Sequence, residues 1–349
     1  MGASLTTPEP LEMQSYFARM VEKGCSVCCM EASSQAISQH RIEGLRFEVG
    51  IFSNLTQDHL DYHKTMARYA AEKKKLFDQC RIGVFNADDP HMEFMRQGVS
   101  CQTYTYGIDH AADYRAEDVR LHAQGVEYHL VAPQGSGHVE LPIPGRFSVY
   151  NSLACAAACL AAGLPMQTVL DGLHRVKTVP GRIEVVPTPG YDFSVILDYA
   201  HTPDGIENIL SAVRDFTKGR VIALFGCGGD RDPQKRPLMG LAAGKGADLC
   251  IVTSDNPRTE NPDSIIKAIL PGVEQSGCPY EVVENRREAI AYALRIAQKD
   301  DAIVLAGKGH EPYQIIGKTK YPFDEKQIVA EELAQMTRDS KERKPECNN

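Results

Sequence analysis

Residues 221–230 read VIALFGCGGD, and this stretch decides the fold class. Five consecutive apolar residues predict a buried β-strand, and the glycines that follow predict a tight turn at its end. Helical periodicity, as at residues 205–215, alternates with further apolar runs. These runs lie at residues 194–197, 249–252, 280–283 and 302–306. Such alternation is typical of a doubly wound, Rossmann-like parallel sheet, so we expect an α/β domain here.

The first half of the chain alternates in the same way, but less regularly. Helices are predicted at residues 11–23, 66–77 and 151–162. Strands are predicted at residues 26–31, 47–52 and 82–86, followed by a small antiparallel excursion within residues 104–144. The character of the sequence changes near residue 178. We therefore expect one domain over residues 1–178, a second over residues 179–335 and a charged tail over residues 336–349.

Composition excludes several classes of protein. The 349 residues carry 38 Lys and Arg against 46 Asp and Glu, a net charge of −8, and no basic stripe that would indicate a nucleic-acid partner. The longest apolar run, residues 153–164, is shorter than the roughly 20 residues that a membrane-spanning helix needs. No signal peptide is recognised, so the 11 cysteines are interpreted as reduced thiols of a cytoplasmic protein. Cys25 and Cys28 are expected in a buried strand rather than in a zinc site.

A polar cluster follows the predicted strand at residues 47–52. Residues 54–63 read NLTQDHLDYH, and Glu31 ends a neighbouring predicted strand. Because ligands bind at the carboxyl ends of parallel strands, the cluster suits a nucleotide or a divalent ion. A solvated polar loop is equally compatible with the cluster alone, and Glu31 favours Mg²⁺, which takes few protein ligands.

Lys73 lies within an apolar helical stripe. At 100° per residue it falls among Met66, Tyr69, Leu76 and Phe77. Its ammonium could simply extend past these neighbours to water. Alternatively, a desolvated lysine loses its proton readily, and the neutral amine can react with CO₂ to form a carbamate, a negatively charged oxygen ligand.

In the second half of the chain, polar or glycine-rich loops follow two of the predicted strands. Residues 226–232 are rich in glycine, which permits close backbone approach, but they lack the dinucleotide fingerprint. Residues 255–258 read DNPR, in which Arg258 offers a fork for a carboxylate and Asp255 and Asn256 could hold an ammonium. By spacing alone, a turn with a surface arginine is favoured. The phosphate-loop pattern G-x-x-x-x-G-K-[ST] does not occur in these 349 residues.

These motifs, together with several others in the same order, resemble those of the Mur ligase family. The others are Thr6-Thr7-Pro8-Glu9, Met30-Glu31-Ala32-Ser33-Ser34, Tyr150-Asn151, Gly181-Arg182-Ile183-Glu184, residues 198–204 and residues 306–311. The resemblance implies an ATP-dependent ligase that builds the peptide of bacterial peptidoglycan. Such ligases activate the carboxylate of a UDP-N-acetylmuramoyl peptide as an acyl phosphate, which the amine of an amino acid then attacks. It also implies an α/β fold with a P-loop-type central ATPase domain and a Rossmann-like carboxyl-terminal domain.

Residue roles follow from the resemblance alone. Glu31, His59 and Lys73, the last as a carbamate, match the residues that serve Mg²⁺ and catalysis. The residues that match contacts to the UDP-muramoyl peptide are Thr6, Thr7, Ser33, Gln39 and Arg41. Those that match nucleotide contacts are Asn54, Arg182 and Asp198. Those that match the amino-acid pocket are Arg231, Asp255, Asn256, Pro257, Arg258, Gly307 and Glu311.

The sequence DNPR resembles the members that add meso-diaminopimelate rather than lysine. Diaminopimelate carries a second carboxylate, which Arg258 can bind, whereas lysine would leave the guanidinium without an anion. The resemblance also implies a monomer with small-molecule substrates only: the UDP-muramoyl dipeptide, meso-diaminopimelate and ATP.

The chain departs from the family pattern at its start. The family's uridine-binding domain and phosphate loop would precede residue 1, so we expect the central domain to be incomplete and the isolated chain to have little ligase activity. One alternative is a non-catalytic binding module. Another is a different ligase of the superfamily, of the folylpolyglutamate or cyanophycin type.

Overall fold

The computed structural model describes residues 5–56, 60–177 and 181–342 and gives two compact units. The first contains residues up to 119, residues 128–139 and residues 149–174, and the second contains residues 120–127, residues 140–148 and the chain from residue 175 on. In the described part of the chain, no helix has both the length and the apolar character needed to cross a membrane.

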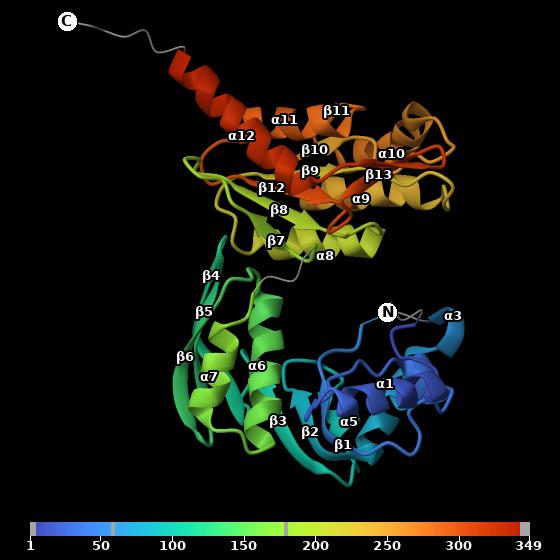
Figure 1. The fold of residues 1–349 in the computed structure, drawn as a ribbon, viewed down its shortest axis with the longest axis vertical. Coiled ribbons are helices and arrows are strands. Elements are labelled where there is room, and N and C mark those ends of the chain that lie inside the picture. The colour runs from blue at the N-terminus through green and yellow to red at the C-terminus, as the bar shows by residue number, and fades with distance from the viewer. Residues whose placement is uncertain (1–4, 57–59, 178–180, 343–349) are drawn as a thin grey trace, which may run out of the picture. The chain divides into compact units, whose positions relative to one another are not determined.

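A six-stranded sheet runs through the first half of the chain in the order β1-β2-β3-β4-β5-β6 (Figure 1). Its strands are β1 (Phe47–Phe52), β2 (Cys80–Asn86), β3 (Gln102–Gly107), β4 (Tyr114–His122), β5 (Gly125–Ala132) and β6 (Gly135–Leu141). The first four pair in parallel. Two-residue connections join β4 to β5 and β5 to β6, and such short connections permit only antiparallel neighbours. The predicted strands at residues 47–52 and 82–86 and the antiparallel excursion are therefore confirmed.

Helices cover this sheet. They are α1 (Pro10–Glu22), α2 (Ser34–Ser38), α3 (Leu60–His63), α4 (Met66–Lys74) with a 3₁₀ turn (Lys75–Gln79), α5 (Met92–Arg96), α6 (Arg146–Ala161) and α7 (Met166–His174). One core joins β1 and β2 to α4 through Phe52, Tyr69, Phe77 and Phe85. The helices predicted at residues 11–23, 66–77 and 151–162 correspond to α1, to α4 with its 3₁₀ turn and to α6, whereas α2, α3, α5 and α7 were not predicted.

The predicted strand at residues 26–31 is wrong. These residues form no strand, and Cys25 and Cys28 are exposed, so the expectation of a buried strand for this pair is wrong as well. An apolar run becomes a strand only where a neighbouring strand satisfies its backbone groups. The described sheet has β1 at its edge and does not include this segment.

The second sheet has the order β11-β10-β9-β12-β8-β7. Its strands are β7 (Glu184–Val186), β8 (Ser194–Asp198), β9 (Val221–Phe225), β10 (Leu249–Val252), β11 (Tyr280–Val282) and β12 (Ala302–Ala306). All pair in parallel except β7, which is antiparallel to β8. A hairpin of β13 (Tyr313–Ile316) and β14 (Thr319–Pro322) follows β12. The strand order confirms the doubly wound α/β prediction.

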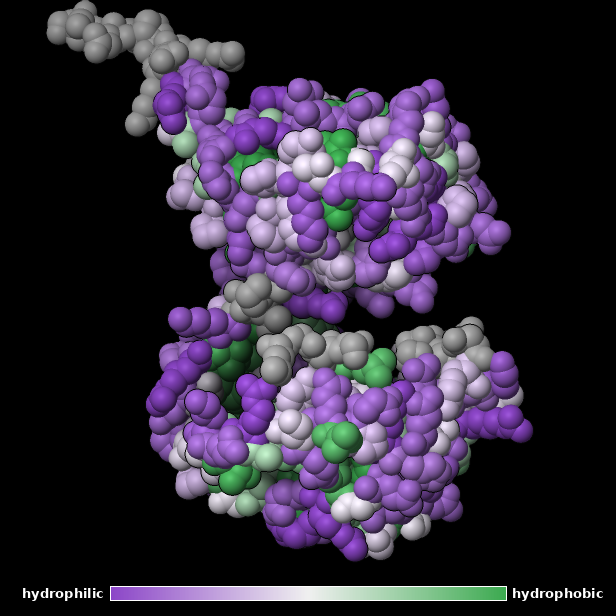
Figure 2. All heavy atoms as spheres, turned by 45° about the vertical axis from the view of Figure 1, so that its right-hand side comes forward, coloured by the Kyte–Doolittle hydropathy of each residue, from purple (hydrophilic) through white to green (hydrophobic). Residues whose placement is uncertain are grey.

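Helices flank both faces of the second sheet (Figure 1). One face packs against α8 (Pro203–Arg214), α9 (Lys235–Gly246) and α10 (Pro262–Ser276). The other packs against α11 (Arg286–Ile296) and α12 (Glu325–Glu342). Strands covered on both faces must be apolar throughout, which explains why β9 and β12 are continuous apolar runs. Figure 2 shows that hydrophilic residues cover most of the visible face of each unit, between separate hydrophobic patches.

The carboxyl ends of the parallel strands β8, β9, β10 and β12 all lie at one edge of this sheet. Because β12 returns between β8 and β9, the strand order reverses there, and ligands of such sheets bind at that reversal.

Candidate active site

Asp255 and Asn256 lie just past β10 on this edge, and both are buried. The Asp255 carboxylate lies 3.3 Å from the Lys308 ammonium, measured from Oδ1 to Nζ. Oδ1 is buried and accepts no hydrogen bond from any described residue. The Asp255 side chain as a whole is 9% exposed, so its carboxylate carries negative charge to the rim of the cluster.

Asn256 has its amide oxygen and its amide nitrogen in different surroundings. Oδ1 accepts hydrogen bonds from Lys308 Nζ and from the backbone N–H of Ile315, both at 2.9 Å. Nδ2 donates to Glu311 Oε2 at 3.1 Å. The amide therefore connects the end of β10 to residues that follow β12, and it faces Glu311 with a donor.

Lys308 is fully buried and was not identified as a site residue from the sequence. Its Nζ also donates to the carbonyl oxygen of Tyr313 at 2.9 Å. Burial lowers the pKa of the Lys308 ammonium, while attraction by Asp255 opposes the shift. The signal that could have revealed Lys308 is a lysine between two glycines directly after a buried apolar strand.

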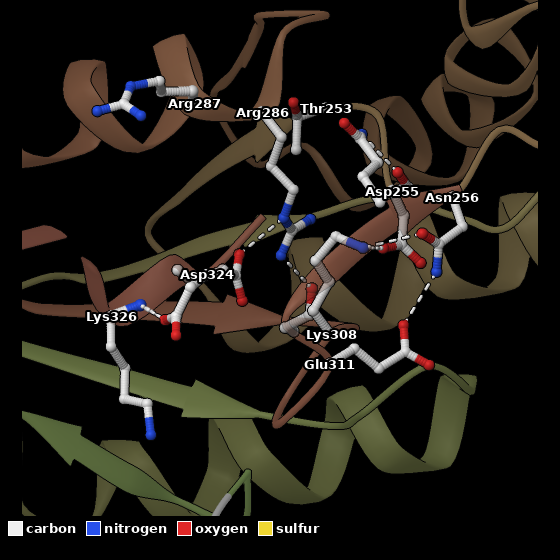
Figure 3. A network of polar contacts seen from close by, with 12 residues as sticks. Thr253, Asp255, Asn256, Arg286, Arg287, Lys308, Glu311, Asp324 and Lys326 are labelled. Carbon is white, nitrogen blue, oxygen red and sulfur yellow. Dashed lines mark hydrogen bonds and ion pairs between the residues drawn. The ribbon is translucent and has the colours of Figure 1, made fainter. Parts of the chain in front are cut away.

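A second buried ion pair lies beside Lys308 (Figure 3). Arg286 Nε donates to Glu325 Oε1 at 2.8 Å, and both side chains are at most 1% exposed. Arg286 Nη2 donates to the carbonyl oxygen of Ala306 at 2.9 Å, at the end of β12. Two buried cations and two buried carboxylates therefore balance one another around the strand end from which Lys308 extends.

Arg258 lies at the rim of this cluster. Its backbone has φ of 51°, its N–H donates to Ile315 O, and its Nη1 donates to Gly229 O at 2.8 Å. Asn256 and Pro257 follow Asp255 in the chain, and a Cβ at Gly307 would lie 3.7 Å from the Asp255 carboxylate. Arg231 is exposed on the neighbouring glycine-rich loop.

The glycines of residues 226–229 serve loop packing. A Cβ at Gly226 would lie 2.2 Å from Thr253 O, and a Cβ at Gly229 would lie 1.9 Å from Pro257 O. Only glycine allows the loop after β9 to approach the loop after β10 so closely. The glycine-rich loop therefore positions residues 255–258.

Asp198 ends β8 and is buried. Burial raises the pKa of its carboxyl, against the lowering effect of hydrogen bonds from the backbone N–H groups of Ile183 and Ala200 and of the charge of Arg182. Arg182 is exposed, and Gly181 before it has φ of 73° with no room for a Cβ beside His310 N. Asp198 and Arg182 thus lie on the same edge as the Asp255 cluster.

In the first unit, the structure brings together four of the five residues that match contacts to the nucleotide peptide. Thr7 Oγ1 donates to Glu31 O at 2.9 Å and accepts from Ser33 N at 3.0 Å. Arg41 donates to Thr7 O at 3.0 Å and to Gln39 Oε1. Thr6 is exposed beside them.

Lys73 lies on α4 and contributes to a pocket of about 50 Å³ whose lining also includes Ala32, Ser53, Asn54 and Phe77. Its Nζ lies 5.2 Å from the centroid of the Tyr69 ring. Glu31, which precedes Ala32, has an exposed side chain. The predicted ligand His59 lies outside the described residues, and no cluster of three metal-binding side chains occurs among the residues that are described.

Asp88 is a buried hub near the end of β2. It accepts hydrogen bonds from the backbone N–H groups of Ile108, Asp109 and His110 and from Tyr150 Oη. Burial alone would raise its pKa, but these bonds outweigh burial and lower the pKa of the carboxyl to about 2. Tyr150 from the motif Tyr150-Asn151 is thereby fixed to the loop after β2.

Two family models match the chain. The Mur ligase middle domain matches residues 2–159, and the Mur ligase glutamate ligase domain matches residues 181–309. The chain therefore belongs to the Mur ligase family, a class of ATP-dependent, amide-forming ligases, and the expected α/β architecture of that family is confirmed.

Several similar proteins share the name of one particular Mur ligase. The chain is 48% identical over 332 residues to "UDP-N-acetylmuramoyl-L-alanyl-D-glutamate--2,6-diaminopimelate ligase 1" of Clostridium acetobutylicum, covering 95% of this chain and 68% of that protein. It is 49% identical over 331 residues to the 2,6-diaminopimelate ligase of Caldanaerobacter subterraneus, again covering 95% and 68%. A solved structure of a ligase with the same name matches with a TM-score of 0.71 at 36% identity, over 94% of this chain and 69% of that one.

A folylpolyglutamate synthase structure from Thermotoga maritima matches with a TM-score of 0.54 at 19% identity. At that identity the likeness extends to the fold alone.

Proposed function

We propose that this chain belongs to the ligase that adds meso-diaminopimelate to UDP-N-acetylmuramoyl-L-Ala-D-Glu in peptidoglycan synthesis. The main support is the sequence identity of 44–49%, over more than nine-tenths of the chain, to relatives that are named 2,6-diaminopimelate ligases. We propose that its substrates are small molecules. We further propose a cytoplasmic monomer with central, carboxyl-terminal and tail regions divided at about residues 178 and 335.

The amino-acid pocket in this proposal is the edge cluster of the second sheet. Arg258 retains N–H groups beyond the one used by Gly229 O, and a guanidinium binds a carboxylate with two parallel hydrogen bonds. The Asp255 carboxylate supplies negative charge for an ammonium group, and Glu311 adds more. Arg231, Pro257 and Gly307 complete the lining of the pocket. This arrangement fits an amino acid with an anionic and a cationic end.

The reaction in this proposal begins with phosphoryl transfer from ATP to the terminal carboxylate of the nucleotide peptide. The resulting acyl phosphate is attacked by the amine of the incoming amino acid, an amide bond forms, and inorganic phosphate leaves. Phosphoryl transfer depends mainly on positioning and on neutralising charge. The chain would position the nucleotide peptide through five residues: Thr6, Thr7, Ser33, Gln39 and Arg41.

Mg²⁺ would supply the charge neutralisation. Glu31, His59 and Lys73 as a carbamate are the proposed ligands, and Ala32 beside Glu31 lines the same pocket as Lys73. Glu31 and the Lys73 carbamate would supply the oxygen donors that Mg²⁺ prefers, and His59 would add a ring nitrogen. Asn54, Arg182 and Asp198 are the proposed nucleotide contacts, in which Arg182 pairs with phosphate and Asp198 accepts from ribose.

Isothermal titration calorimetry of the purified chain with meso-diaminopimelate and with L-lysine tests the proposed amino acid. The charge-assisted bond to the second carboxylate is worth about 1.5–3 kcal/mol, so at least about tenfold tighter binding of diaminopimelate is expected. Arg258→Ala should abolish this preference, and Arg295→Ala, at an exposed arginine of α11, should keep it. Equal affinity of the unmodified chain for both amino acids would contradict the proposal.

A further inference from the structure

Lys308 is the buried group that the proposed chemistry leaves without a role. It contacts two residues of the proposed amino-acid pocket, Asp255 and Asn256, but its ammonium has no exposure to solvent. A group that ligands cannot reach can still act by fixing the groups that they do reach. The question is which property of the pocket depends on Lys308.

The orientation of the Asn256 amide is such a property. The oxygen and nitrogen of an asparagine side chain are nearly isosteric, so only hydrogen-bond partners decide which one faces a ligand. Lys308 Nζ and Ile315 N are both donors, and both lie 2.9 Å from Oδ1. With the amide turned by 180°, two donors would face Nδ2, and Nδ2 would be lost to Glu311.

We propose that Lys308 is a positioning residue of the amino-acid pocket, which holds Asn256 with its N–H groups towards Glu311 and the ligand and forms an ion pair with Asp255 beside them. This inference rests on the proposed function of the pocket. One N–H of Nδ2 is used by Glu311 Oε2, and the second is available to a carboxylate of the incoming amino acid. Figure 3 shows the Lys308 ammonium directed towards Asp255 and Asn256, and the Asn256 amide directed towards Glu311.

The surrounding charges support a fixed ammonium at this position. Tyr313 O accepts a second hydrogen bond from Nζ, and the centroid of the Phe323 ring lies 5.7 Å away. The neighbouring cation Arg286 is neutralised by Glu325, so Asp255 remains the counter-ion of Lys308. Because Ala306 O is bonded to Arg286, the strand end that carries Lys308 is itself anchored. The end of β12, the loop after β10 and strand β13 thus fix the position of the ammonium without a ligand.

Calorimetry with meso-diaminopimelate on the full chain tests this role with the variant Lys308→Met. We expect at least a tenfold loss of affinity, because one partner of a buried charged pair is removed. Val304→Ala, in the buried centre of β12, is the matched control for stability: it destabilises the same strand without touching the pocket and should retain the affinity of the unmodified chain at a temperature where both variants are folded. Lys318→Met, in the exposed turn between β13 and β14, controls for the loss of one positive charge.

Asn256→Asp tests the orientation independently and covers the case in which Lys308→Met does not fold. Aspartate keeps an acceptor for Lys308 and for Ile315, so this variant should fold, but it presents an oxygen to Glu311 where the amide presents N–H groups. We expect at least a tenfold loss of affinity. Retained affinity in Asn256→Asp, or equal losses in Lys308→Met and Val304→Ala, would overturn the inference. If the unmodified chain fails to bind diaminopimelate, the proposed function fails first, so the two failures are distinguishable.

Discussion

Removal of Arg286 should strongly destabilise the second unit, whereas removal of its neighbour Arg287 should not. Both arginines lie on the first turn of α11, and both pair with glutamates of α12. Arg286 and Glu325 are at most 1% exposed, but the side chains of Arg287 and Glu331 are 47% and 44% exposed. The two positions therefore differ mainly in burial, although Arg286 also donates to Ala306 O and Arg287 also pairs with Glu332.

The magnitude follows from that difference. Deleting one partner of a buried ion pair leaves an uncompensated charge and costs about 3–5 kcal/mol. Arg286 Nη1 and Glu325 Oε2 have no hydrogen-bond partner among the described residues, so the pair is incompletely satisfied and the lower end of the range applies, about 3 kcal/mol for Arg286→Met. Arg287→Met removes an exposed pair worth about 0–1 kcal/mol. In a unit of this size, 1 kcal/mol shifts Tm by roughly 2–4 °C, so the expected losses are about 6–12 °C and less than about 4 °C.

Thermal and urea unfolding followed by circular dichroism measures both variants. The double variant Arg286→Met with Glu325→Met should recover most of the loss, because no buried charge then lacks a partner. Equal losses for Arg286→Met and Arg287→Met, or no recovery in the double variant, would refute the reasoning about burial.

Three further predictions concern other parts of the molecule. The pKa of Asp88 is lowered to about 2, so the ionised carboxylate stabilises the folded chain above pH ~4, and this stabilisation is lost as the pH falls to ~2. Asp88→Asn should therefore lower the free energy of unfolding in urea by about 2 kcal/mol at pH 7 and by little near pH 2. A loss of stability that does not depend on pH would contradict this. Gly181→Ala should lower the Tm more than Gly190→Ala. Both glycines have positive φ, but only the new Cβ at residue 181 would lie close to another atom, 2.5 Å from His310 N. Equal decreases in Tm would argue against this close approach. With ¹³C-bicarbonate, NMR should detect a carbamate signal that disappears in Lys73→Met, and a signal that persists in that variant would place the carbamate elsewhere.

The architecture of the second unit was predictable because its strands are buried on both faces. A strand such as β9 has no polar alternation, and its apolar run ends at glycines, so its bounds are visible in the sequence. The segment at residues 26–31 has the same apolar appearance but no partner strand in the described sheet. Sequence composition records apolar character and carries no information about which neighbour is present.

The candidate site was predictable only where its residues are consecutive. Asp255, Asn256 and Arg258 follow one strand, so their proximity was evident from spacing. Lys308 lies 52 residues from Asn256, and the pair Arg286–Glu325 spans 39 residues; these contacts arise from the strand order, in which β12 lies beside β9. Nothing in the local sequence distinguishes Arg286 from Arg287, yet one is buried and the other is exposed.

The most direct test of the amino-acid pocket is a crystal structure of the chain with meso-diaminopimelate bound. We expect one carboxylate within hydrogen-bond distance of the Arg258 guanidinium and one ammonium beside the Asp255 carboxylate. A bound molecule whose two carboxylates both lie away from Arg258, or binding at a different edge of the second sheet, would contradict the account.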